Sequence, residues 1–266
     1  WIVTTDRGDA MRAKYVVLAN GILTTPKLAR IDGMASFKGE SFHTSRWDYN
    51  IDLAGKRVGI IGTGATAVQV VPEIAKTVGE LYVFQRTPSS IDVRDQRATT
   101  DEEYATWPTE ENWAVKRRER LALISAGRTA LQGNDDFLSG KVTDFKKNRK
   151  QHNTELSPEE LIQRQLNSNF RIMEQIRARV DSIVEDPKTA AALKPYYPYG
   201  CKRPTFHDEY LPTFNLPHVH LVDTAPKGVE LINERGIVHD GVEYPLDVLI
   251  YATGFVWMGT GSFNMI

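Results

Sequence analysis

Residues 57–67 read Arg57-Val58-Gly59-Ile60-Ile61-Gly62-Thr63-Gly64-Ala65-Thr66-Ala67, an apolar run followed by a glycine-rich turn. The pattern predicts a strand over 57–61 and a helix from Ala65 to about Ala75. Gly62 permits a sharp reversal, and a side chain at Gly64 would keep a pyrophosphate from the N–H groups at the helix start. We interpret the stretch as a dinucleotide-binding turn with ligand contacts at Gly62, Thr63, Gly64, Ala65 and Thr66; the alternative is a purely structural turn.

The strand predicted at Leu81 to Phe84 completes a βαβ unit, and the residues after it bear on the nucleotide. A site for NAD would place a carboxylate at this strand end, where it would repel a 2′-phosphate. Here the chain continues with Arg86 and Thr87. A guanidinium forms paired charge-assisted bonds to phosphate, so we expect NADP as the ligand. The alternative is a solvated surface arginine.

Composition sets the broad class of the protein. The 266 residues are 41% hydrophobic and 25% charged, which is typical of a soluble globular chain. The formal net charge of −1 gives no global attraction to nucleic acid or to an anionic membrane, and no apolar run is long enough to cross a bilayer. A single cysteine, Cys201, excludes an internal disulfide and a Cys-x-x-Cys redox site. We expect a cytoplasmic protein without nucleic-acid or membrane partners.

Two distant segments share one layout, in which a hairpin-like unit leads into an apolar strand that ends at a glycine. The first runs from Trp1 through an apolar strand at 14–18 to Ala19-Asn20-Gly21, and the second runs from Glu230 through 247–251 to Ala252-Thr253-Gly254. Such strands suit the interior of a parallel sheet, and the glycine lets backbone approach a ligand. Because only one opening turn is present, we expect residues 1–21 to close a first domain whose own turn lies upstream. Two unrelated hairpins are the alternative.

Between about residues 99 and 195 the sequence becomes charged and helical, which predicts a helical insertion. Ser157-Pro158-Glu159-Glu160 is a strong helix start. The helix should carry one apolar stripe, made of Ile162, Leu166, Phe170, Met173, Ile176 and Val180. Beyond the insertion, His218 and His220 share one face of a predicted strand, but no further ligand is evident and we assign no metal. The predicted fold class is α/β, a Rossmann-like fold with two dinucleotide-binding domains, a parallel sheet with a β-meander, and a helical insertion.

The segment ahead of the glycine turn narrows the family. It reads Phe37-Lys38-Gly39-Glu40-Ser41-Phe42-His43-Thr44-Ser45-Arg46-Trp47-Asp48. On physical grounds Phe37 and Trp47 would bury large surfaces, and His43 would be a structural residue in a linker. The pattern Phe-x-Gly-x-x-x-His-x-x-x-Trp-Asp resembles the fingerprint of the Baeyer-Villiger monooxygenases. We call Phe37, Gly39, His43, Trp47 and Asp48 the fingerprint residues; the resemblance implies that His43 couples domain movement to catalysis.

A second basic site follows the predicted insertion at Lys202-Arg203, after Tyr197-Pro198-Tyr199-Gly200. Taken alone it is a surface basic pair. The same family has a Lys-Arg pair at this point of the chain, and the resemblance implies that Lys202 meets the 2′-phosphate of NADP beside Arg86, while Arg203 is the catalytic cation that faces FAD. Cys201 has no base partner, so we expect an inert packing residue.

The resemblance implies an FAD- and NADPH-dependent monooxygenase that inserts one oxygen of O2 next to a ketone carbonyl and forms an ester or lactone. It implies five parts: the end of an FAD domain with the fingerprint (1–50), a first NADP part (51–98), the insertion (99–195), a second NADP part (196–251) and a return to the FAD domain (252–266). One alternative is a flavin monooxygenase that oxidises nitrogen or sulfur, although such relatives usually end the fingerprint with Tyr or Phe. Another is an NADP-binding module without activity.

Overall fold

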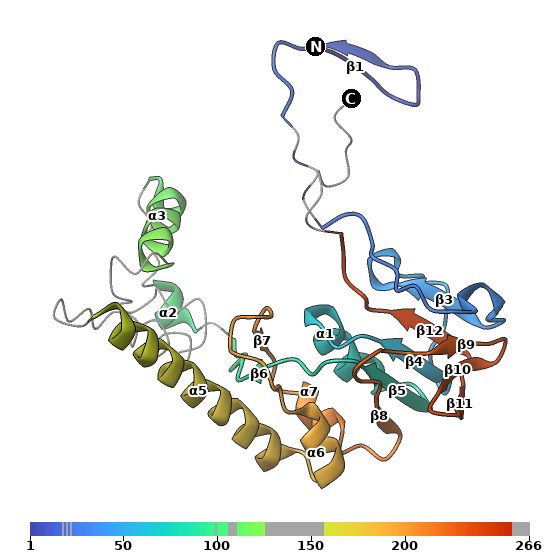
Figure 1. Cartoon of the computed structure of the whole chain (residues 1–266). Coiled ribbons are helices and arrows are strands. Elements are labelled where there is room, and N and C mark those ends of the chain that lie inside the picture. The colour runs from blue at the N-terminus through green and yellow to red at the C-terminus, as the bar shows by residue number, and fades with distance from the viewer. Residues whose placement is uncertain are drawn as a thin grey trace.

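A computed structural model describes residues 1–17, 19, 21, 23–98, 100–105, 111–125 and 157–256. Its centre is a five-stranded sheet in the order β3-β12-β4-β5-β8, and all neighbouring strands are parallel (Figure 1). The strands are Glu40–His43 (β3), Arg57–Ile61 (β4), Glu80–Gln85 (β5), Val219–Asp223 (β8) and Val248–Tyr251 (β12). The predicted parallel α/β sheet is confirmed.

The central strands of the sheet are those with unbroken apolar sequence. All four residues of β12 and the last four of β4 are buried, as expected for strands covered on both faces. Helix α1, Ala65–Ile74, follows β4 directly and buries Ala67, Val68 and Val71 against the sheet. The βαβ unit therefore has the bounds that the sequence predicts, to within a residue or two at each end.

Each face of the sheet has its own cover. On one face, β4, β5 and β12 pack against α1, against the short helix α7 at Tyr210–Thr213, and against the last turns of the long helix α5. On the other face lies a three-stranded antiparallel meander made of Leu231–Ile232 (β9), Gly236–His239 (β10) and Val242–Pro245 (β11). Its buried Ile232 and Ile237 pack with Phe84 and Leu249 of the sheet. This confirms the predicted meander.

The fingerprint segment contributes a strand to this sheet. Residues Glu40–His43 were expected in a linker, but they form the edge strand β3, which pairs in parallel with β12. Two short 3-10 turns flank it, at Met34–Ser36 and at Thr44–Arg46. The polar residues Glu40 and Ser41 are exposed, which is normal at a sheet edge, and only Phe42 and His43 are buried. The fingerprint is thus built into the same sheet as the glycine turn.

The hairpin and apolar strand predicted at residues 1–21 are only partly present. Ile2–Thr4 (β1) and Ala10–Arg12 (β2) form the expected antiparallel hairpin. The apolar strand expected at 14–18 is wrong for residues 14–17, which lie in no strand, and Leu18 and Asn20 lie outside the described residues. Tyr15 and Val17 are exposed. The physical reason is that a strand needs a neighbour to pair with, and among the described residues none lies beside this segment.

Helices make up the described part of the predicted insertion. They are Asp101–Ala105 (α2), Trp113–Ser125 (α3), Pro158–Ile183 (α5) and Pro187–Leu193 (α6). Helix α5 starts with the predicted capping box, since Ser157 and Glu160 each accept a backbone N–H of the other. Two further short strands, Ile91–Asp92 (β6) and Thr205–Phe206 (β7), pair at the point where the chain enters and leaves this helical part.

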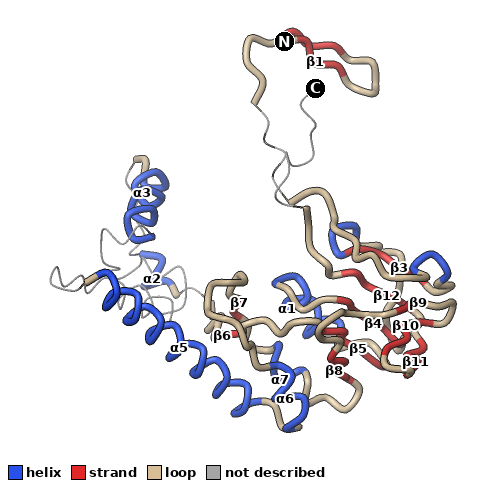
Figure 2. The backbone as a smooth tube through the Cα atoms, in the orientation of Figure 1, coloured by secondary structure: helices blue, strands red, loops and turns tan. Residues whose placement is uncertain are grey.

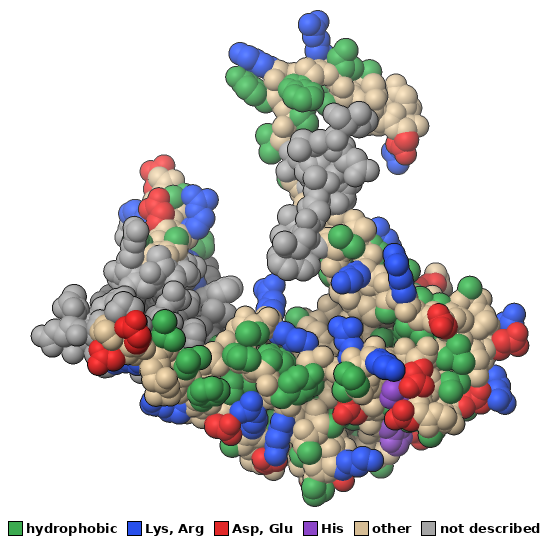
Figure 3. Space-filling model, in the orientation of Figure 1, with side chains coloured by type: hydrophobic (Ala, Val, Ile, Leu, Met, Phe, Trp, Pro, Cys, Tyr) green, Lys and Arg blue, Asp and Glu red, His purple; other side chains and the backbone are tan. Residues whose placement is uncertain are grey.

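The apolar stripe on α5 divides into two halves. Met173, Ile176 and Val180 are buried, with exposed fractions of 1%, 2% and 1%. Ile162 and Phe170, by contrast, are 59% and 57% exposed, so the stripe is not one buried face as predicted. Only the C-terminal half of the helix reaches the sheet and α7. Figure 3 shows apolar side chains at the surface beside this helix.

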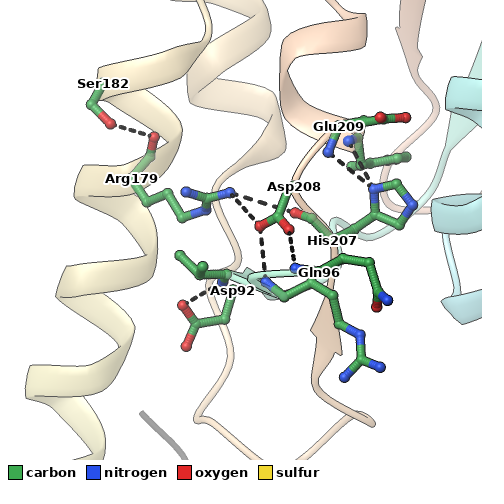
Figure 4. Close-up of polar contacts among 10 residues, drawn as sticks. Asp92, Gln96, Arg179, Ser182, His207, Asp208 and Glu209 are labelled. Carbon is green, nitrogen blue, oxygen red and sulfur yellow. Dashed lines mark hydrogen bonds and ion pairs between the residues drawn. The ribbon is translucent and has the colours of Figure 1, made fainter. Parts of the chain in front are cut away.

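A polar cluster fastens α5 to both chain segments that cross between the sheet and the helices (Figure 4). The Asp208 carboxylate accepts the backbone N–H groups of Arg94 and Gln96, at 2.9 and 3.2 Å. The Arg179 guanidinium on α5 lies 4.0 Å from the same carboxylate. Although partial burial opposes ionisation, the N–H groups and the charge of Arg179 keep the pKa of Asp208 below its usual value. The carboxylate is therefore charged at neutral pH and holds three elements together.

Two chain segments lie side by side where the chain leaves the sheet toward the β1-β2 hairpin (Figure 2). The Lys27 N–H donates to Gly254 O at 2.9 Å, and the Val256 N–H donates to Thr25 O at 3.0 Å. Pro26 and Phe255 form an antiparallel bridge between these bonds. None of the described helices is long and apolar enough to span a membrane.

Candidate dinucleotide-binding site

The candidate site lies at the carboxyl edge of the parallel sheet. Because the strands are parallel, the ends of β3, β12, β4 and β5 meet there, at His43, Ala252, Gly62 and Arg86. Ligands of open α/β sheets bind outside the carboxyl ends of the strands. Four predicted groups of site residues, which are far apart in the sequence, therefore come to one edge.

The glycine turn has the backbone geometry that the sequence predicts. Gly62 has a φ of +109°, and a Cβ atom there would lie 2.6 Å from Ala252 O, directly after the neighbouring strand β12. A Cβ atom at Gly64 would meet nothing within 4 Å. Gly64 also caps α1 without any side-chain hydrogen bond, so the first N–H groups of the helix are open toward this space. An uncapped helix start beside open space fits a pyrophosphate.

The loop after β5 is tied to this turn. Thr63 is buried, and its hydroxyl donates to Thr87 O at 2.8 Å. The Ser89 hydroxyl donates to Thr63 O at 2.5 Å. The side chain of Thr63 thus fixes the loop, and only its backbone remains for a ligand. The loop that carries Arg86 and Thr87 is held against the turn by bonds that the sequence does not reveal.

Arg86 and Lys202, which we call the cationic pair, are connected through Tyr197. Its hydroxyl donates to Pro88 O in the loop that begins after Arg86, and Lys202 Nζ lies 5.3 Å from its ring centroid. Partial desolvation of the amine lowers the pKa of Lys202, and the charge of Arg86 lowers it further. Neither side chain has an ion-pair partner among the described residues. The stem of Arg86 lies against the loop after β8, since a Cβ atom at Gly228 would be 3.6 Å from Arg86 Cδ. Two neighbouring cations without a carboxylate form a site for a multiply charged anion such as a phosphate monoester.

The segment that follows the helices presents Lys202 and Arg203 at the surface. Gly200 has a φ of +91°, and the Cys201 N–H donates to Pro198 O at 3.1 Å, so the chain turns sharply just before the two basic residues. Arg203 is exposed and makes no hydrogen bond or ion pair to a described residue. Cys201 is exposed as well, so the expectation that it packs in the interior is wrong.

Most fingerprint residues shape the edge of the sheet. Phe37 packs on the cluster between the meander and the sheet. A Cβ atom at Gly39 would lie 2.5 Å from Asp247 O, so only glycine fits. The Trp47 ring packs edge to face on Phe42, with centroids 4.9 Å apart, and Asp48 accepts the Asn50 N–H in a turn. These four positions are explained by packing and backbone geometry.

His43 is the fingerprint residue that lies at the ligand edge. It is 6% exposed, and its Nδ1 accepts the Ser45 N–H at 3.1 Å. Its ring lies edge to face on Phe255, with centroids 5.8 Å apart. Desolvation lowers the pKa of His43, while the adjacent backbone of Gly254 acts in the opposite direction. The imidazole is therefore neutral at pH 7, and it touches one of the two paired segments that leave the sheet.

The third group of predicted ligand residues, Ala252-Thr253-Gly254, follows β12. Ala252 is buried and donates its N–H to Ile61 O at 2.9 Å. The Thr253 hydroxyl donates to Lys27 O. Gly254 has a φ of +86° and open space around it. Only Gly254 keeps its surroundings free, whereas Ala252 and Thr253 are used to join chain segments.

The remaining histidine pair does not converge on one point. His218 Nε2 lies 2.9 Å from Ala75 O, and His220 Nε2 lies 2.6 Å from the Glu80 carboxylate. Each imidazole therefore has its own protein partner.

Comparisons with known proteins agree with this geometry. Residues 1–102 match the family described as flavin-binding monooxygenase-like. A Baeyer-Villiger monooxygenase of Stachybotrys chlorohalonatus is 46% identical over 97% of this chain and 43% of the relative. The solved polycyclic ketone monooxygenase of Thermothelomyces thermophila is 44% identical, with a TM-score of 0.82 over 96% of this chain and 44% of its own.

A third comparison is with a solved structure of OTEMO in complex with FAD and NADP, which is 31% identical with a TM-score of 0.68 over 97% of this chain and 50% of its own. The chain spans roughly half of these relatives' lengths, with 43% for the first and 50% for the last. Its glycine turn, its edge-strand fingerprint and its parallel sheet lie in a stretch that these relatives match almost end to end. The chain therefore belongs to the family of the Baeyer-Villiger monooxygenases.

Proposed function

We propose that this chain provides the NADP-binding part of a monooxygenase that uses NADPH, FAD and O2 to insert oxygen next to a ketone carbonyl, giving an ester or lactone. The observation that carries the proposal is the uncapped start of α1 at the carboxyl edge of the sheet, where Thr63 also bonds to the loop that carries Arg86. The names of the relatives and the cofactors in the OTEMO structure support the reaction class.

The residues at the glycine turn would hold the pyrophosphate through backbone N–H groups. We assign this contact to Gly62, Thr63, Gly64, Ala65 and Thr66. Arg86, Thr87 and Lys202 would hold the 2′-phosphate, because a doubly charged phosphate offsets the repulsion between the two cations. Gly254 would allow close approach of the cofactor at the end of β12, with Ala252 and Thr253 shaping the backbone beside it.

FAD, when bound, supplies the redox chemistry with O2. We assign to Arg203 the role of the cation next to the reacting atoms. Its guanidinium is exposed and has no described partner, so its charge is not already neutralised. A fixed guanidinium keeps its charge at every working pH and stabilises the negative charge that develops on the substrate's carbonyl oxygen. Arg203 is therefore a candidate catalytic residue, and Lys202 a binding residue.

His43 would couple domain movement to the site. Its neutral, buried ring contacts Phe255 and the Gly254 backbone, where the chain leaves the sheet. Movement of that segment would change the surroundings of the ring directly. We retain the five-part division of the chain (1–50, 51–98, 99–195, 196–251 and 252–266) as part of the proposal; much of 99–195 and the end of the last part lie outside the described residues. A cytoplasmic location fits an NADPH-dependent enzyme of near-neutral net charge.

The test uses ketone-dependent NADPH consumption together with product analysis by mass spectrometry. Arg203→Ala should still permit reduction of the flavin by NADPH but should abolish ester formation. Lys202→Ala should raise the KM for NADPH and leave kcat for bound substrate largely unchanged. Continued ester formation by Arg203→Ala would remove that residue from the proposed role, and equal affinity of the wild type for NADH and NADPH would contradict the cationic pair.

The same assay, together with the absorbance of the purified chain, distinguishes two alternative functions. A flavin enzyme that oxidises nitrogen or sulfur would consume NADPH with amines or sulfides and form no lactone. A pure NADP-binding module would bind NADP without any flavin; a purified chain with the yellow absorbance of bound flavin would count against it.

A further inference from the structure

Tyr197 contacts both Lys202 and the loop that follows Arg86, and these contacts point to a role that neither the sequence pattern nor the relatives' names assign. The segment 195–199 connects α6 to the turn before Lys202. On the side of the sheet it approaches the loop 87–90, which begins directly after Arg86. On the other side it approaches α5. The side chain of Tyr197 is half-buried between these parts.

The Tyr197 hydroxyl forms hydrogen bonds with two backbone groups of the loop after β5. It donates to Pro88 O at 3.0 Å and accepts the Ser90 N–H at 3.1 Å. One hydroxyl thus satisfies two backbone groups of the loop that carries Arg86. Burial raises the pKa of Tyr197, so the hydroxyl keeps the proton that it donates. A phenylalanine at this position would leave both backbone groups without this partner.

The ring of Tyr197 serves the other member of the pair. Lys202 Nζ lies 5.3 Å from the ring centroid, within the range of a cation–π interaction. The aromatic face attracts the ammonium group without neutralising it, unlike a carboxylate, so the charge remains available to an anion. The same residue therefore contacts Lys202 with its ring and the Arg86 loop with its hydroxyl.

The segment is also anchored from the helical side. Asn169 on α5 forms a reciprocal pair with Tyr199, since its Nδ2 donates to Tyr199 O and its Oδ1 accepts the Tyr199 N–H, both at 2.9 Å. Arg177 Nε donates to Pro195 O at 2.9 Å. The backbone on either side of Tyr197 is thereby fixed, so the ring has a defined place between the loop and Lys202.

We propose that Tyr197 is a positioning residue for phosphate selection: it sets the distance between Arg86 and Lys202, and so determines how strongly the site prefers a dinucleotide with a 2′-phosphate. The inference rests on the proposed function, in which the cationic pair binds that phosphate. It goes further by naming the residue through which the two cations act as one site.

The experiment compares two probes that differ by one phosphate. Adenosine 2′,5′-bisphosphate and AMP are titrated into the full chain by calorimetry, and the ratio of their dissociation constants measures the preference for the 2′-phosphate. Tyr197→Phe should lower this ratio about 10-fold, since two hydrogen bonds that fix the loop are lost. Tyr197→Leu should lower it by about a further 3-fold, since the cation–π contact is lost too. Affinity for AMP should stay within about 2-fold of the wild type in both, because AMP does not use the pair.

Two controls show whether Tyr197 acts through its neighbours. Tyr196, the adjacent tyrosine, is 67% exposed, and Tyr196→Phe should leave the ratio unchanged. In a Lys202→Ala background, the step from phenylalanine to leucine at position 197 should cause no further loss, since the ring then has no ammonium to hold.

Each result has one meaning. A wild-type ratio near one would contradict the proposed function, and the positioning role with it. A strong wild-type preference that persists in both Tyr197 variants would overturn the positioning role and leave the proposed function intact. An equal loss of affinity for both probes would show that Tyr197 only supports the fold, which also overturns the inference.

Discussion

Alanine at Gly62 and alanine at Gly64 should have different effects, although only Thr63 separates the two glycines. Gly62→Ala should destabilise the fold. Gly64→Ala should leave stability nearly unchanged and weaken dinucleotide binding. The difference follows from the surroundings of each position, since a Cβ atom at Gly62 would collide with Ala252 O at 2.6 Å, and one at Gly64 would point into open space.

The magnitude at Gly62 has two contributions. Holding a non-glycine residue at a φ of +109° costs about 1–3 kcal/mol. The contact with Ala252 O is made to backbone directly after β12, which is held by the bond from Ala252 N–H to Ile61 O, and overpacking of this kind costs about 1–3 kcal/mol. The sum of roughly 2–6 kcal/mol corresponds to a fall in Tm of about 10 °C for a chain of this size.

At Gly64 the two small effects on stability oppose each other. Its φ of −72° suits alanine, and the loss of glycine's freedom in the unfolded chain favours the folded state by about 0.4–1 kcal/mol. Alanine is a poorer helix N-cap than glycine, which costs a similar amount. The new methyl group would instead occupy the space at the start of α1, so affinity for NADPH should fall at least about 10-fold, or ~1.4 kcal/mol.

Thermal unfolding followed by circular dichroism, and NADPH titration followed by calorimetry, separate the two effects. Wild-type Tm in Gly62→Ala would refute the close approach of β4 and β12 at this point. Unchanged NADPH affinity in Gly64→Ala would refute the placement of the pyrophosphate at the start of α1. Each variant is the control for the other.

Three further predictions follow from other contacts. Arg57 holds the Asp247 carboxylate through paired hydrogen bonds at 2.6 and 3.1 Å and lowers the pKa of Asp247 to about 2. Because the folded pKa is below the unfolded value of about 3.9, this stabilisation is present above pH 4 and is lost as the pH falls toward 2. Both side chains are more than a third exposed, so the ion pair contributes little. Asp247→Asn should lower the free energy of unfolding in urea by only about 1 kcal/mol at pH 7, and by almost nothing near pH 2. Lys202→Ala should weaken NADPH binding about 10-fold and leave NADH binding unchanged by fluorescence titration, and equal weakening of both would contradict its phosphate contact. Met173→Ala should cost about 2–4 kcal/mol in thermal unfolding, whereas Phe170→Ala should cost no more than about 0.5 kcal/mol, and similar costs would show that the stripe on α5 is buried along its whole length.

The sequence predicts the centre of the fold well because the relevant signals are local. Residues 57–85 carry an apolar strand, a glycine turn, a helix and a second strand within one short stretch, and each element lies close to where the pattern places it. The last strand, β12, was equally predictable, because four consecutive apolar or aromatic residues indicate a strand that is covered on both faces of the sheet.

Signals that depend on distant partners were missed or misplaced. Residues Glu40–His43 have mixed polarity, and they become a strand only because β12, far along the chain, offers an edge to pair with. The residues 14–17 have stronger strand character, yet they lie in no strand for want of a neighbour. Periodicity shows that α5 has an apolar face, but it does not show which part of that face is covered.

The residue types of the candidate site were predictable from the sequence, but the hydrogen bonds that connect its loops were not. Arg86 and Lys202 were both predicted as phosphate ligands from the sequence, and in the structure Tyr197 contacts both Lys202 and the loop after Arg86. The buried Thr63 was expected to contact the ligand, whereas its hydroxyl fixes the loop after β5. The two bonds of Tyr197 join residues 107 and 109 positions apart, and no local pattern announces such contacts.

The separation of Arg86 from Lys202 along the chain has a consequence for how discrimination arises as the polypeptide folds. In the proposed site, binding of a dinucleotide through its pyrophosphate depends on a contiguous strand, turn and helix, which can form early because loop closure within such a unit is short. Discrimination between NADPH and NADH would also require Lys202, which reaches the site only once the intervening helices have docked. A nascent or partly unfolded molecule would therefore bind NADH and NADPH with similar affinity. The preference for NADPH would be the last property to form during folding and the first to be lost on heating.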